Sequence, residues 1–108
     1  MTVHVVLFRP RAGLSIEERD ALLDAIRRAA SRIESVRGFR IGSHVQDAPT
    51  YAIGSFPVFP YMALIEFDDE AGLRAYLDHP AHLELAERFT EAAEAAYIYD
   101  FTITGELR

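Results

Sequence analysis

Hydrophobic and polar positions along the chain predict four strands. Residues 2–9 are rich in β-branched side chains and apolar on both faces, as in a strand that is covered on both sides. Alternating apolar positions predict further strands over residues 39–47, 61–67 and 97–104, and residues 105–108 form a tail. The helical segments that lie between these strands show a different period, as described next.

A first helix is indicated after residue 14. Ser15 and Glu18 have the spacing of a capping box, in which each side chain accepts a hydrogen bond from the other residue's backbone N–H. The apolar stripe that follows has a period of about 3.6 residues. We therefore expect a helix to about Ser35, ended by Gly38.

A second helical region follows residue 67, with Asp68 or Asp69 placed to cap it. It must break near Pro80, because proline lacks an N–H and disfavours helical geometry in the residue before it. Proline is favoured at the first position of a helix, so a further helical segment is expected from Pro80 to about Ala96.

The order of these elements, β-α-β-β-α-β, predicts an α+β ferredoxin-like fold over a single domain, residues 1–108. Such a fold has a four-stranded antiparallel sheet in the order 4-1-3-2, with both helices on one face. The other face has no helix to cover it, yet three of the strands are apolar on both faces. We therefore expect a homodimer that packs sheet against sheet.

The segment 48–60 contains three prolines and is unusually apolar for a loop. It is expected to pack either as the wall of a pocket or as an arm of the dimer interface.

Composition excludes several classes of function. The net charge of −6 without a basic cluster argues against nucleic-acid binding, and the absence of cysteine excludes disulfides and thiolate chemistry. The N-terminus enters a strand directly and lacks the features of a signal peptide, and no apolar run has the length of a membrane span. A cytoplasmic protein without a membrane contact is expected.

Candidate catalytic side chains lie close together in the sequence where the second helical region breaks. Tyr76, His79 and His82 follow one another at intervals of three, so they lie close together if the backbone stays helical. His82 opens the segment after Pro80, where the positive end of the helix disfavours an imidazolium, so a neutral His82 can act as a general base.

Three further polar residues are expected beneath the helices. In the predicted sheet, Asp100 and His4 lie on adjacent strands, and Tyr61 lies on the strand beyond. A carboxylate inside an apolar strand needs a partner, and either His82 or His4 can be that partner. An aspartate bonded to one imidazole nitrogen would fix the tautomer of the ring and leave the other nitrogen free.

Structural roles remain open for the same residues. His82 can cap its helix or form a buried pair with Asp100, His79 can end a helix, Tyr76 can belong to the core, and His4 can be a satisfied core histidine. A two-histidine, one-carboxylate metal site drawn from these residues is a third option, but the spacing across a proline is poor for it. We expect neither a metal nor a cofactor.

The chain resembles the stress-responsive dimeric α/β-barrel (Dabb) family over nearly its whole length. The residues that carry the likeness are Val3–Phe8, Gly42, the segment Tyr76-Leu77-Asp78-His79-Pro80-Ala81-His82, and Tyr99-Asp100-Phe101. The resemblance implies two copies that close into an α/β barrel. The family includes plant stress proteins and a plant polyketide cyclase, whose catalytic tyrosine and histidine correspond to Tyr76 and His82.

Two departures weaken the transfer of that cyclase's substrate, because a family histidine is replaced here by Tyr61 and the segment 48–60 is more apolar. The sequence thus favours a cofactor-free acid–base enzyme of the cyclase or lyase type for a small hydrophobic carbonyl compound. We expect His82 as base, Asp100 to orient it and Tyr76 as hydrogen-bond donor, with His4, Tyr61 and His79 contacting substrate. The alternative is a non-catalytic stress-responsive or small-ligand-binding protein.

Overall fold

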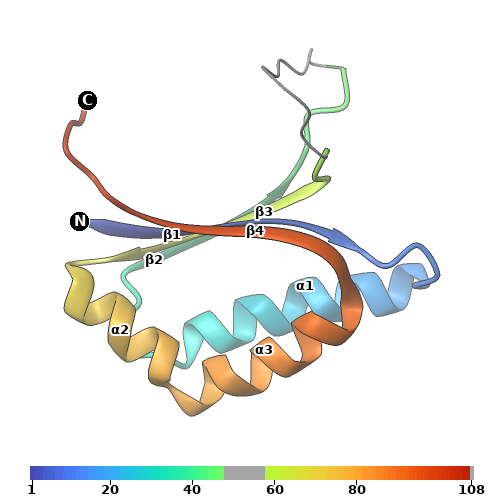
Figure 1. The fold of residues 1–108 in the computed structure, drawn as a ribbon, viewed down its shortest axis with the longest axis horizontal. Helices are drawn as coiled ribbons and strands as arrows, with labels where there is room; N and C mark the ends of the chain where they lie inside the picture. The colour runs from blue at the N-terminus through green and yellow to red at the C-terminus, as the bar shows by residue number, and fades with distance from the viewer. Residues whose placement is uncertain (48–57, 108) are drawn as a thin grey trace.

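Within residues 1–47 and 58–107, which the computed structural model describes, four strands form one antiparallel sheet and three helices lie against one of its faces (Figure 1). The elements are β1 (Thr2–Pro10), α1 (Ile16–Ser31), β2 (Gly38–Ser43), β3 (Tyr61–Phe67), α2 (Glu70–Asp78), α3 (Pro80–Ala92) and β4 (Ala93–Thr102). The spatial order β2-β3-β1-β4 confirms the predicted ferredoxin-like arrangement.

The helix α1 begins as predicted but ends earlier. Ser15 and Glu18 form the complete capping box. The helix ends at Ser31 and not near Ser35, because the next residues tighten into i→i+3 bonds that turn Ile33, 4% exposed, into the core. Gly38 therefore does not end the helix; it begins β2.

The strand β2 stops at Ser43 and does not reach Asp47 as predicted. Its ladder with β3 ends at the pair Ser43–Tyr61, and one further backbone bond follows, from the His44 N–H to the Pro60 carbonyl at 2.8 Å. The loop 48–60 was expected to wall a pocket or reach across a dimer, and residues 48–57 of it lie outside the described residues.

The helical region that breaks at Pro80 begins where the sequence predicted, but it ends earlier than predicted. Asp69 caps α2 by accepting from the Gly72 backbone N–H at 2.9 Å. The segment that begins at Pro80 ends at Ala92 and not near Ala96, so β4 is longer than predicted. The alanine-rich residues 93–96 favour a helix by propensity, but pairing with β1 overrides that preference.

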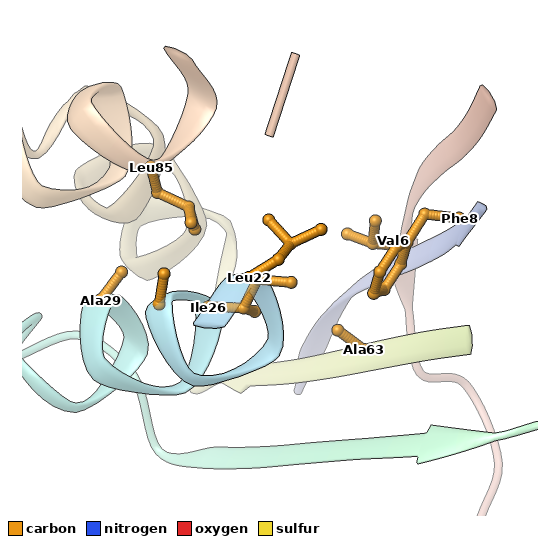
Figure 2. Packing of buried hydrophobic residues seen from close by; sticks show 8 residues of the cluster. Val6, Phe8, Leu22, Ile26, Ala29, Ala63 and Leu85 are labelled. Atoms are coloured by element: carbon orange, nitrogen blue, oxygen red, sulfur yellow. The ribbon is translucent and has the colours of Figure 1, made fainter. Parts of the chain in front are cut away.

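The core lies between the helices and the sheet. Figure 2 shows Leu22 and Ile26 of α1, Leu85 of α3, and Val6 and Ala63 of the sheet meeting in this layer. A second cluster at the other end includes Ile65, Phe67 and Tyr76. Burial of these side chains holds α2 and α3 at fixed positions over β1, and so fixes the residues that they carry.

The other face of the sheet carries apolar side chains without a covering element among the described residues. Tyr97, Tyr99 and Phe101 of β4 lie there side by side and are 39–53% exposed. The register places Tyr97 and Tyr99 opposite Leu7 and Val5 of β1. None of the described helices combines the length and the apolar character that crossing a membrane requires.

Candidate functional site

A cavity of about 170 Å³ lies between the sheet and the helices α2 and α3. His4, Tyr76, His82 and Thr90 contribute the polar part of its lining. Its other walls are apolar and come from five elements: Val6, Ile26, Ala63, Ile65, Leu85, Ala86, Phe89 and Ile98. Because Ile98 is 53% exposed, the cavity reaches the surface beside β4. No arginine and no carboxylate is among the described residues that line it.

The His82 ring has a defined tautomer. Its Nδ1 lies 3.1 Å from the carbonyl oxygen of Leu77, which can only accept, so Nδ1 carries the proton and donates. The neutral ring then has a bare Nε2 for the cavity. Burial lowers the pKa of His82; the bond to Leu77 opposes this shift and the nearby His4 adds to it. The neutrality expected of His82 thus rests mainly on burial.

Tyr76 lies between the two imidazoles. The centroid of its ring is 4.7 Å from that of His82 and 5.5 Å from that of His4. The residue is 2% exposed, and no described residue hydrogen-bonds its hydroxyl. Burial first, and the negative charge of Asp100 second, raise the pKa of Tyr76 to about 12. The phenol therefore stays protonated at neutral pH and is a donor for a ligand.

Asp100 bonds His4 and not His82. Its Oδ1 lies 2.6 Å from Nδ1 of His4, and the two residues are directly opposite each other in the β1–β4 register. The expectation that Asp100 orients His82 is therefore wrong; the Leu77 carbonyl has that role. The alternative partner, His4, is the one that the structure selects.

Tyr61 and His79 lie outside the cavity lining. Tyr61 is at the start of β3, four residues from Ile65, or about 13 Å at the usual rise of a strand, and its ring stacks on Phe8. His79 caps α3, since its Nδ1 accepts from the Ala81 backbone N–H at 3.0 Å. The structure thus does not bring these two residues together with Tyr76, His82 and His4.

A metal centre finds no support in the geometry. Within the described part of the chain, no group of three or more histidine and carboxylate side chains is placed to hold a metal ion. His79 is engaged as a helix cap, and Nδ1 of His82 bonds the Leu77 carbonyl while Asp100 bonds His4, so the ligand set considered from the sequence is not assembled.

The arrangement can perform proton transfer. A bare imidazole nitrogen and an unpaired phenol meet in one apolar cavity, with the histidine of an Asp–His pair beside them. An apolar setting strengthens hydrogen bonds to an oxygen on which charge develops. These are the groups needed to remove a proton next to a carbonyl and to hold the resulting oxyanion.

The sequence reasoning missed the Leu77 carbonyl and the part of the cavity wall formed by Phe89, Thr90 and Ile98. No side-chain type signals a backbone acceptor, so the first could not be found. The signal for the second was present, because Ile98 has the same strand parity as Asp100.

Solved structures similar to this chain share its fold. A hydroxynitrile lyase from Passiflora edulis has 19% identity and a TM-score of 0.84, over 99% of this chain and 96% of that one. A dimeric ferredoxin-like protein of unknown function from Thermobifida fusca has 19% identity and a TM-score of 0.76, over 94% and 90%. SnoaB, a cofactor-independent oxygenase from Streptomyces nogalater, has 13% identity and a TM-score of 0.73, over 98% and 95%.

At these identities the likeness shows the fold alone, and no curated protein matches the sequence. Residues 2–103, however, match the family described as the Stress responsive A/B Barrel Domain. That match spans nearly the whole chain and agrees with the sheet order and the helical layer described above. The chain belongs to the stress-responsive A/B barrel domain family.

Proposed function

We propose that this protein is a cofactor-free acid–base enzyme of the lyase or cyclase type, acting on a small, neutral carbonyl compound. The observation that carries the proposal is the His82 ring, whose Nδ1 is held by a backbone carbonyl while the ring lines an apolar cavity. A histidine held in this way presents a single basic nitrogen in a fixed direction.

The step is a proton transfer from carbon. The lone pair of His82 Nε2 takes the proton from the carbon next to the carbonyl group. The electrons of that C–H bond form the C=C bond of an enolate, and the carbonyl oxygen gains the displaced pair. The Tyr76 hydroxyl donates a hydrogen bond to this oxygen, and its pKa of about 12 keeps it protonated at neutral pH. The enolate carbon can then form a bond to an electrophilic carbon, as a cyclase requires, or its electron pair can form a C=C bond while a leaving group departs from the neighbouring carbon with its own pair, as a lyase requires.

Cavity size and lining narrow the substrate. A cavity of about 150 Å³ accommodates benzene, so 170 Å³ holds one six-membered ring or a branched chain of similar bulk. A longer tail can leave past the exposed Ile98. Without an arginine in the described lining, a carboxylate or phosphate would lose its hydration uncompensated, which favours a neutral compound. A polyketide-like substrate fits only with most of its length outside.

Structural neighbours support the reaction class. A hydroxynitrile lyase and a cofactor-independent oxygenase have this fold, and the first belongs to the lyase class proposed here. Several neighbours are described as dimeric. We therefore also propose a homodimer that buries the open sheet face with Tyr97, Tyr99 and Phe101.

Exchange of carbonyl α-hydrogens for deuterium tests the reaction. Small ketones and aldehydes with α-hydrogens, up to the size of cyclohexanone, are incubated in D2O and followed by NMR. We expect exchange above the buffer rate with the wild-type protein and loss of at least tenfold in His82→Gln, since general base catalysis contributes about 10²–10⁴. Asp24→Asn, on the exposed side of α1, is the matched control.

A non-catalytic role is the second candidate. An apolar cavity with an unpaired phenol and a bare imidazole nitrogen also describes a binding site for a small ligand. Binding of the carbonyl compounds, seen as a raised melting temperature, with exchange no faster than in buffer would favour this candidate.

A further inference from the structure

Two imidazoles line the same cavity, and each has its Nδ1 engaged outside it. His82 donates to the Leu77 carbonyl, and His4 is bonded to the Asp100 carboxylate. Nε2 is thus the nitrogen that either ring can offer to a ligand. The two anchors differ in one respect, since a carbonyl carries no formal charge and a carboxylate does.

The difference in anchor gives the two rings opposite tasks. A carboxylate 2.6 Å from Nδ1 is placed to stabilise an imidazolium, as the aspartate of a catalytic triad does for its histidine. The His4 side chain is only 4% exposed, so a proton on it needs this compensation. His82 has no such partner, and burial together with His4 lowers its pKa.

We propose that His4 is a second acid–base group of this cavity and that Asp100 is its positioning residue. The assignment rests on the cavity being the reaction site proposed above. The His4 imidazolium donates its Nε2 proton to the oxygen of a bound carbonyl while His82 takes the proton from carbon. Charge balances, because one imidazolium disappears as the other forms and the substrate becomes a neutral enol.

Proton movement at one ring assists the other. The positive charge of His4 is one cause of the lowered pKa of His82. When His4 gives its proton to the substrate, that repulsion ends and His82 holds a proton more strongly. The apolar cavity never has to hold two imidazolium ions, nor lose its single positive charge, at any point in the transfer.

Asp100 stands at the boundary between the cavity and solvent. It belongs to the edge strand β4, its side chain is 39% exposed, and it lines a separate surface hollow near Arg74 and Leu77. A substitution there leaves the core intact, so Asp100→Asn tests the pair with little risk to folding.

Two fluorinated probes distinguish a hydrogen bond from the proposed acid group from binding to the apolar cavity alone. 4-Fluorophenol mimics an enol or enolate, and 4-fluorotoluene has nearly the same shape without the hydroxyl. Both are titrated into the wild-type protein and followed by ¹⁹F NMR. We expect 4-fluorophenol to bind at least about tenfold more tightly, with its resonance shifted toward that of the phenolate, because a charge-assisted hydrogen bond is worth a factor of this order.

Variants of Asp100 and His82 show which residue causes the preference for 4-fluorophenol. Asp100→Asn is expected to remove the phenolate-like shift and most of the tenfold preference, while the affinity for 4-fluorotoluene changes less than twofold. Asp100→Glu should restore part of the preference. His82→Gln is expected to retain the preference, since the proposal places the donor at His4.

The outcomes separate this proposal from the one on which it rests. If Asp100→Asn retains the shift and the preference, His4 is not the acid, and the role of His82 stands unaffected. The same conclusion follows if His82→Gln alone abolishes them. If neither probe binds the wild-type protein, the cavity is not a ligand site, and both proposals fail.

Discussion

His79 Nδ1 accepts the backbone N–H of Ala81 at 3.0 Å, and this bond removes the donor that a continuous helix would aim at the Leu77 carbonyl. The Leu77 carbonyl instead accepts a hydrogen bond from His82 Nδ1, at 3.1 Å. The break in the helix therefore creates the anchor of the proposed base. His79 is not among the residues that line the cavity, yet it determines which atom holds His82.

Replacing His79 tests this link. In His79→Ala the Ala81 amide loses its acceptor and competes for Leu77, so we expect the His82 Nδ1–H tautomer to decline. ¹⁵N NMR of the ring nitrogens measures that population. Loss of the cap should also cost about 1 kcal/mol of unfolding free energy. Glu87→Ala, at an exposed position of α3, is the control; an unchanged His82 tautomer in His79→Ala contradicts the link.

Stability should depend on pH through His82. Its pKa is lowered in the folded protein, so between that value and about 6.5 the unfolded chain binds more protons than the folded one. Its contribution is complete above about pH 6.5 and is lost as the pH falls toward the folded pKa. Urea unfolding at pH 7.5 and 5.5 should show a smaller difference for His82→Gln than for wild type. An equal difference would show that His82 does not titrate abnormally.

Tyr76→Phe should separate binding from stability. The hydroxyl has no hydrogen-bond partner among the described residues, so its removal should leave the unfolding free energy within about 1 kcal/mol of wild type. Carbonyl α-exchange should fall at least about tenfold, because the developing oxyanion loses its donor. A drop in stability of several kcal/mol with unchanged exchange would instead mark Tyr76 as a purely structural residue.

Filling the cavity should block ligands without unfolding the protein. Ala86 lines the cavity from α3 and is partly exposed, so Ala86→Leu places three further carbons inside it. We expect 4-fluorotoluene binding to weaken at least about tenfold, since a benzene-sized ligand needs most of the volume. Ala71→Leu, on the exposed start of α2, is the matched control. Equal affinities in both variants would place the ligand elsewhere.

The open sheet face should control assembly. Tyr99 is 53% exposed on that face, and Leu83 is 56% exposed on the opposite, helical side. A charge inside an apolar interface is costly, so Tyr99→Asp should shift sedimentation toward the monomer while Leu83→Asp does not. Wild-type protein that sediments as a monomer at all concentrations would refute the proposed dimer.

The sequence predicted the sheet order and the helix starts because the signals for them are local. Capping side chains such as Ser15 act within one turn, and the run of β-branched and apolar residues from Val3 to Phe8 is visible along the strand itself. The helix predicted over residues 93–96 was wrong for the opposite reason. The helical propensity of these residues is a local property, but their pairing with β1 is not. The partner of Asp100 depends on the same register, and a sequence with two candidate histidines could not decide it.

The β1–β4 register shifts between Arg9 and Pro10, so β4 has one more residue than β1 at this point, Glu94. Below it, the Arg11 N–H is tied to the Ala92 carbonyl at 2.8 Å, which fixes the end of α3. If regular pairing continued without this bulge from the Pro10–Ala93 pair, Glu94 would lie opposite Arg9, and the two faces of the rest of β4 would be exchanged. Tyr99 would then lie opposite His4, and Asp100 would point into the open face. The extra residue Glu94 thus determines which side chains of β4 face the cavity and which face the open side of the sheet. The proposed chemistry and the proposed dimer therefore depend on the same register.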